Sequence, residues 1–77
     1  MSTTLDLIKV GQKCRILAMT GAPQLVQRLQ EFGLLEGEEV RVLATAPLGD
    51  PLEISAGFSR LSLRKAEAAT IQVQPAE

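Results

Sequence analysis

The residues of this chain whose types and spacing most suggest chemistry are three cations, Arg60, Arg64 and Lys65, that lie within six positions of one another. A compact group of positive charges suits an acidic partner, because such charges speed association more than they tighten the complex. The same residues also fit the ordinary solvated face of a small protein. Both interpretations stay open at the level of sequence.

A second feature is the turn sequence Ala46-Pro47-Leu48-Gly49-Asp50-Pro51. Proline fixes φ and has no N–H to give to a sheet, while glycine and aspartate are common turn residues, so the segment predicts a stiff loop between two strands. Leu48, near the tip, either folds inward or stands exposed as an apolar anchor for a partner. As a hypothesis, the partner-binding surface consists of Leu48, Gly49, Asp50, Arg60, Arg64 and Lys65.

Other kinds of chemistry are poorly represented. The chain has no histidine and one cysteine, whereas a structural zinc site uses four Cys or His ligands. It also lacks an activated nucleophile and a glycine-rich phosphate loop, which argues against an enzyme. We therefore predict no catalytic residue, cofactor or metal site, although surface carboxylates can still collect a divalent ion weakly. Cys14 is expected to be a buried, unreactive thiol.

Composition limits the class of protein further. We interpret residues 1–77 as one domain, with 45% apolar residues and only two phenylalanines as aromatics. A net charge of −1 and the lack of stacking aromatics argue against nucleic-acid binding, and the same lack disfavours a groove for Pro-rich peptides. No apolar run reaches the roughly 20 residues of a membrane span, and no signal peptide is evident, so we expect no membrane insertion and a cytoplasmic location.

One helix is predicted over residues 23–32. Pro23 suits its first turn, and Gly33 suits the C′ position, where φ is often positive. Leu34 would then contact Leu29 across the helix end, as in a Schellman motif. The apolar residues expected on the inner face of this helix are Leu25, Leu29 and Phe32.

The remaining patterns predict five short strands, over residues 13–19, 40–46, 52–56, 58–63 and 70–74. Single helical turns are expected at residues 4–8, with Thr4 as a candidate N-cap, and at 64–69. Residues 1–3 and 75–77 are expected to fray. Since closure removes unprotected sheet edges, we predict a mainly β fold: a small SH3-like barrel with the helix inserted after the first strand, plugging one end. The inward residues of the first two strands would be Cys14, Ile16, Ala18, Val40, Val42, Ala44 and Ala46.

Three blocks of this sequence resemble the ferrous iron transport protein A family, whose members carry FeoA-like domains. They appear in the family's order and cover almost the whole chain. Departures from the family pattern occur at Phe32, at Leu35-Glu36 and at Ser59. The matching blocks are Arg28-Leu29 with Gly33-Leu34, Gly37 and Val40; Ala46-Pro47-Leu48-Gly49-Asp50-Pro51; and Leu61-Ser62-Leu63-Arg64-Lys65 with Glu67-Ala68.

The resemblance implies a cytoplasmic bacterial protein that is accessory to FeoB, a membrane permease for ferrous iron with a GTP-binding domain. It implies a protein-interaction module rather than an enzyme. Alternatives are a GTPase activator that inserts Arg60 or Arg64 into the partner, or a metal-responsive regulatory domain acting in trans. Weak self-association is a further expectation, since an acidic cluster can pair with the basic group of a neighbouring molecule. That cluster is Glu36, Glu38 and Glu39.

Overall fold

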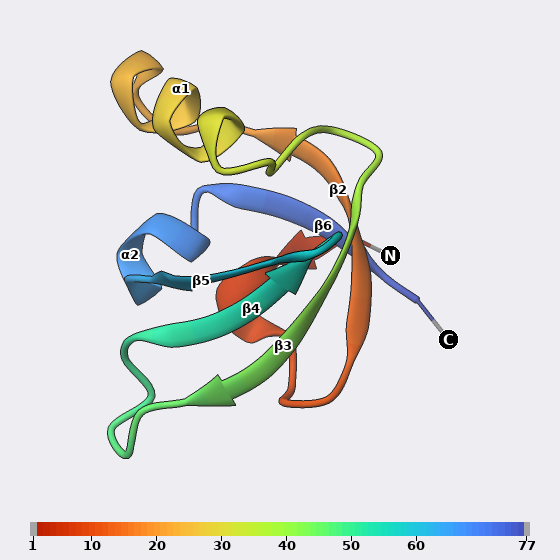
Figure 1. Cartoon of the computed structure of the whole chain (residues 1–77), viewed down its shortest axis with the longest axis vertical. Coiled ribbons are helices and arrows are strands. Elements are labelled where there is room, and N and C mark those ends of the chain that lie inside the picture. Colours follow the sequence, from red (N-terminus) through yellow and green to blue (C-terminus); the bar gives the residue numbers. More distant parts are fainter. Residues whose placement is uncertain (1, 77) are drawn as a thin grey trace.

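The computed structural model describes residues 2–76 and consists mainly of one curved antiparallel sheet (Figure 1). The elements in chain order are β1 (Thr3–Thr4), the 3-10 helix η1 (Leu5–Leu7), β2 (Lys13–Met19), α1 (Pro23–Glu31), β3 (Glu39–Thr45), β4 (Leu52–Ala56), β5 (Ser59–Leu63), α2 (Lys65–Ala68) and β6 (Ile71–Pro75).

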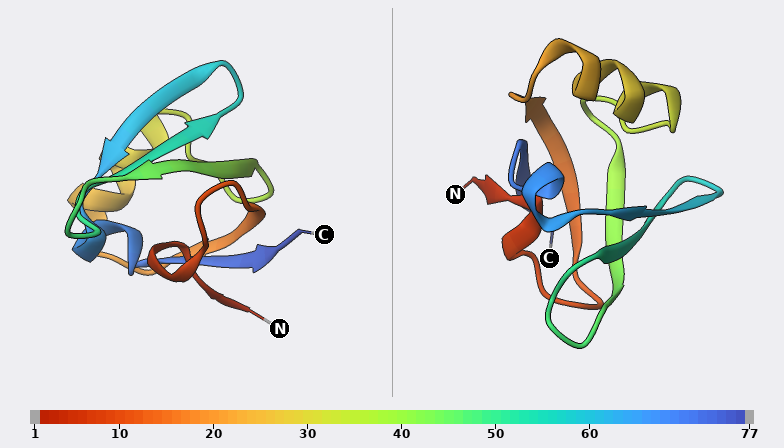
Figure 2. Two further views of the ribbon diagram at one scale, coloured as in Figure 1. Left: turned by 90° about the horizontal axis from the view of Figure 1, so that it is seen from below. Right: turned by 90° about the vertical axis from the view of Figure 1, so that its left-hand side faces the viewer.

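The strands follow the order β1-β6-β2-β3-β4-β5. The sheet curls around its core as in an SH3-like barrel (Figure 2). Within the described residues, however, β1 and β5 are edge strands, each with one unpaired side, here called its free margin. The predicted closure is therefore wrong. The predicted strand count is also one too low. β1 is only two residues long and forms where Thr3 pairs with Val73, so it has no alternation that a sequence could reveal.

This same pairing corrects the expectation of frayed ends. Thr3 lies in β1, and Pro75 pairs with Cys14 at the end of β6. The backbone N–H of Ala76 donates to the carbonyl of Lys13 at 2.9 Å. The rest of the prediction, for residues 1 and 77, lies outside the described part of the chain.

The core is aliphatic, as the composition predicts. Its largest fully buried side chains come from η1, α1, the segment after α1 and the inner faces of the strands, and they include Leu5, Ile16, Leu29, Leu34 and Ile54. η1 contributes through Leu5, whereas Thr4 does not cap it: the Thr4 hydroxyl donates to the Asp6 carboxylate instead of accepting a backbone N–H.

Two β-bulges break the predicted alternation. Register shifts occur between Ile16 and Ala18 and between Val42 and Ala44. A bulge opposes two residues to one and rotates the following side chains, so Ala18 is only half-buried and Ala44 is exposed. Both residues were expected to face inward, and that expectation is wrong.

Helix α1 forms largely as predicted and lies in the connection from β2 to β3, beyond the end of β2 (Figure 1). It ends in a Schellman motif: the N–H of Leu34 donates to Leu29 O at 3.0 Å, and that of Gly33, with φ of 96°, donates to Gln30 O at 2.9 Å. Phe32, at the C-cap, turns outward and is 53% exposed, so its predicted inward position is wrong.

Candidate interaction surface

The loop between β3 and β4 is held by two backbone hydrogen bonds. The N–H of Ala46 donates to Pro51 O at 3.0 Å, and the N–H of Gly49 donates to Ala46 O at 2.7 Å. Gly49 has a φ of 84°, a conformation that favours glycine, so its residue type is required by the turn. The loop is therefore internally braced, in agreement with the stiffness expected from its two prolines.

Leu48 projects from this braced loop with 94% of its surface exposed. Of the two alternatives that the sequence left open, the inward one is therefore wrong for this residue. An exposed leucine on a rigid support loses little conformational freedom on binding, which is the property of a good interface anchor.

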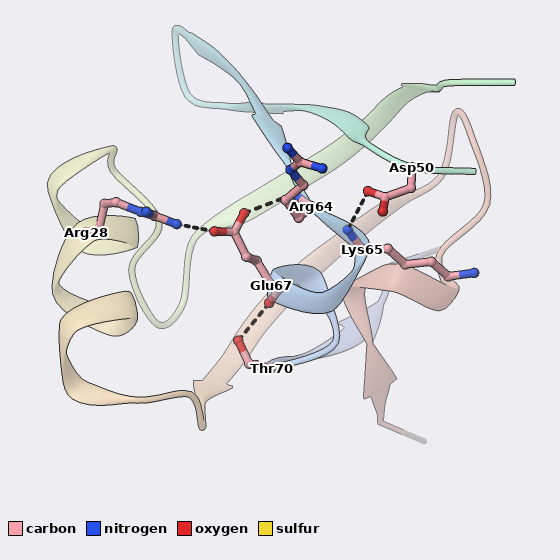
Figure 3. A network of polar contacts seen from close by, with 6 residues as sticks. All are labelled: Arg28, Asp50, Arg64, Lys65, Glu67 and Thr70. Carbon is pink, nitrogen blue, oxygen red and sulfur yellow. Dashed lines mark hydrogen bonds and ion pairs between the residues drawn. The ribbon is translucent and has the colours of Figure 1, made fainter. Parts of the chain in front are cut away.

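Asp50 joins the loop to the start of α2. Its Oδ1 accepts a hydrogen bond from the backbone N–H of Lys65 at 2.9 Å (Figure 3). The contact joins the end of the loop, two residues after Leu48, to the start of α2 at Lys65. Asp50 thus has a positioning role within the chain, in addition to any contact with a partner.

Arg60 is separated from this region along β5. It pairs with Ser55, whereas Leu63, next to Arg64, pairs with Leu52 at the other end of the ladder. Its guanidinium lies 3.9 Å from the Glu53 carboxylate, with the Arg60 side chain 73% exposed. The structure therefore links the loop residues Leu48, Gly49 and Asp50 to the segment of Arg64 and Lys65 through one contact. Arg60 lies four residues before Arg64, about 13 Å away along the strand at roughly 3.3 Å per residue. We call the group of five, Leu48, Gly49, Asp50, Arg64 and Lys65, the loop surface.

A polar network around Glu67, which the sequence did not predict, holds the backbone at Arg64 and links α2 to α1 (Figure 3). Oε1 of Glu67 accepts the backbone N–H of Arg64 at 2.9 Å, which is the glutamate half of a capping box. Oε2 of the same carboxylate forms an ion pair with Arg28 of α1, and the Thr70 hydroxyl donates to Glu67 O at 2.7 Å. The sequence signal for this contact was Glu67, which lies three residues after Arg64, the N-cap of α2.

The described part of the structure contains no cluster of metal-ligating side chains. Among residues 2–76, no group of three or more His, Cys, Asp or Glu side chains is arranged to hold an ion. None of the helices in this part of the chain is long and apolar enough to span a membrane.

Cys14 is fully buried in the core, and burial, assisted by the negative charge of Glu39, raises the pKa of its thiol to about 11. We expect iodoacetamide to leave the native protein unlabelled near neutral pH and to label it once urea has unfolded it. Because the folded state keeps this proton longer than the unfolded chain does, the free energy of unfolding should fall as the pH rises from about 9 towards 11. Rapid labelling of the native protein would contradict the burial.

Comparison with known proteins places this architecture in one family. The model of the FeoA domain matches residues 3–75. The solution structure of a FeoA protein from Chlorobium tepidum is 32% identical, with a TM-score of 0.92 over 97% of this chain and 71% of that one.

Two crystal structures agree. An iron uptake regulatory protein (FeoA) is 26% identical, with a TM-score of 0.87 over 99% of both chains. FeoA from Stenotrophomonas maltophilia, described as a prokaryotic SH3 domain protein complexed with zinc, is 33% identical, with a TM-score of 0.82 over 94% of this chain and 89% of that one. Together with the match of the family model over residues 3–75, these structural likenesses identify the chain as a member of the FeoA domain family.

Proposed function

We propose that this FeoA domain is a non-enzymatic accessory module of ferrous iron transport that binds the cytoplasmic part of a FeoB-type membrane permease. Family membership supports the role in ferrous iron transport. The S. maltophilia relative, described in terms of ferrous iron transport activation, supports a regulatory rather than a carrier role.

The observation that carries the proposal is the loop surface. Leu48 supplies an exposed apolar anchor, and the braced turn fixes its position. Arg64 and Lys65 are both exposed, and the Asp50 contact holds the backbone of Lys65 against the same loop. An apolar centre with a cationic rim suits a protein partner whose own surface is apolar and acidic.

The residue inventory supports binding rather than catalysis. The chain has no histidine, and its one cysteine is buried with a raised thiol pKa. A nucleophile with an adjacent base, the usual arrangement for covalent catalysis, is therefore not available from those two residue types.

The test is capture of the purified permease, in detergent and with or without a GTP analogue, by the immobilised domain. We expect Leu48→Asp to reduce capture at least tenfold, because it places a charge where an apolar anchor must be desolvated. Leu35→Asp is the matched control: Leu35 is an exposed leucine, 45% accessible, in the segment that leads into β3 at the end opposite the loop.

The possible outcomes test separately whether the permease is the partner and whether the loop surface is the binding site. Equal capture of wild type and Leu48→Asp would retain the permease as partner and reject the loop surface. No capture by the wild-type domain in any nucleotide state would reject the permease as partner. Circular dichroism of both variants establishes that each is folded.

A further inference from the structure

We propose that the free margin of β5 binds an extended peptide segment that alternates acidic and apolar residues, which adds to the sheet as a further strand. This is a second binding surface, distinct from the loop surface, and it does not depend on the identity of the transport partner.

The first observation is that β5 is a regular but unpaired margin. It forms a continuous ladder with β4, and in the described part of the chain no other strand lies beyond it (Figure 2, left). Within residues 2–76, no other backbone hydrogen bond involves Ser59–Leu63. The opposite margin, β1, has only two residues and offers too few groups for pairing. β5 is therefore the margin that can accept a strand.

The geometry of the β4–β5 hairpin decides which backbone N–H and C=O groups of β5 face away from the sheet. Gly57 and Phe58 form a two-residue turn; Gly57 has a φ of 60° and Phe58 does not have a positive φ, which describes a type II′ turn. Such a turn makes Ala56 and Ser59 a hydrogen-bonded pair. By alternation, the backbone groups of Ser59, Leu61 and Leu63 bond to β4. Those of Arg60 and Ser62 consequently point away from the sheet.

The side chains of β5 specify an alternating partner. Leu63 is buried and Leu61 is only partly buried against the core, while Arg60 and Ser62 are exposed on the other face. An added strand would place every second side chain beside Leu61, where an apolar residue extends the core. The intervening side chains would lie beside Arg60, where a carboxylate is favoured.

Charge decides between an acidic segment and a second copy of β5. β5 and the turn before it, residues 57–63, contain Arg60 and no acidic residue. The carboxylate of Glu53 on β4 lies 3.9 Å from the Arg60 guanidinium, and both side chains are exposed. Two β5 strands side by side would bring like charges together, whereas an acidic segment would neutralise them.

β5 lacks two of the usual protections of a sheet margin. Natural margins are blunted by short strands, charged side chains, proline, bulges or a covering helix or loop. β2 and β3 carry bulges, but the β4–β5 ladder keeps its register throughout, and Ser59–Leu63 contains no proline. Its start is flanked by Phe58, whose side chain is entirely exposed. A regular margin without proline or bulge meets the structural requirement for strand addition, and its one charged side chain, Arg60, favours an acidic segment.

The experiment titrates the labelled protein with a synthetic acetylated and amidated peptide in which valine and glutamate alternate over seven residues, followed by amide NMR. We expect saturable shifts and slower hydrogen exchange at the amides of Arg60 and Ser62. The same peptide with lysine in place of glutamate should bind at least tenfold more weakly, and Arg60→Glu should reduce the preference for the glutamate peptide.

Ser62→Pro supplies the decisive variant. It removes an outward N–H that the fold does not use, so the protein should remain folded while peptide affinity falls at least tenfold. Ser62→Ala keeps the N–H and should bind within twofold of wild type. Leu48→Asp should also bind normally, so this proposal and the proposed function fail separately.

Four results would overturn the proposal. The first is an absence of saturable shifts at Arg60 and Ser62 with the glutamate peptide, and the second is equal affinity for the lysine peptide. The third is slow hydrogen exchange of the Ser62 amide in the protein without peptide, which would place its N–H inside the ladder. The fourth is concentration-dependent shifts at the same amides without peptide, which would assign the margin to a second copy.

Discussion

Ile54→Ala is expected to lower the free energy of unfolding of this domain by about 2–5 kcal/mol, the largest effect of any substitution considered for this chain. Ile54 lies in the middle of β4, is fully buried and pairs with Val42 on one side and Leu61 on the other. Removing a buried isoleucine side chain to alanine costs about 2–5 kcal/mol. A single core in a chain of this size supplies only about 3–5 kcal/mol of stability. One substitution can therefore offset most of it.

The measurement is urea denaturation followed by far-ultraviolet circular dichroism, because the chain has neither tryptophan nor tyrosine for fluorescence. Leu48→Ala is the matched control: it also truncates a branched aliphatic side chain, but at a position that is 94% exposed. Its free energy of unfolding should stay within about 0.5 kcal/mol of wild type. Equal destabilisation by the two variants would contradict the assigned core.

Glu67→Ala is expected to have the second-largest effect, lowering the free energy of unfolding by about 1–2 kcal/mol. The substitution removes the acceptor for the Arg64 N–H and the ion pair with Arg28 at the same time. The Glu67 side chain is 21% exposed and that of Arg28 is 55% exposed, so solvent screens the ion pair and the hydrogen bond contributes the larger share.

Two further variants separate the contribution of the hydrogen bond to Arg64 from that of the ion pair with Arg28. Glu67→Gln retains an oxygen for the Arg64 N–H and should cost less than Glu67→Ala, and Arg28→Ala should cost about 0.2–1 kcal/mol. A double-mutant cycle between Arg28→Ala and Glu67→Gln isolates the ion pair. If Arg28→Ala alone destabilised the domain as much as Glu67→Ala, the capping role of Glu67 would be refuted.

The same network links stability to the loop surface. Glu67 holds the backbone at Arg64, and Asp50 holds the backbone at Lys65. The first contact fixes the first turn of α2 itself, and the second joins that turn to the loop that carries Leu48. We therefore expect Asp50→Ala, measured in the permease capture assay, to weaken binding although its carboxylate is occupied within the chain. Unchanged capture by this variant would show that the loop needs no such support.

Local features of the fold could be predicted from sequence because they depend on residues close together in the chain. Pro23 and Gly33 mark the start and the end of α1, and Leu34 completes its Schellman motif. The alternation of Leu52, Ile54 and Ala56 gives β4 with the predicted bounds and inner face. The turn at residues 46–51 follows from the conformational limits of proline and glycine.

The errors lie where the conformation depends on a distant partner. β1 exists only because β6 is beside it, and each bulge reflects how its strand fits a twisted neighbour. An outward Phe32 follows from the direction in which the chain leaves α1. None of these has a distinct local signal.

By itself, the sequence determined the family, the aliphatic core, the single helix and a stiff loop with an apolar tip beside cations. The tertiary structure alone decided which of those cations share a surface. Asp50 reaches Lys65 across 15 positions and Arg28 reaches Glu67 across 39, so these contacts form only when the sheet has folded. The same folding leaves β5 at a free margin, because strand order is set by long-range pairing and not by the residues of the strand itself.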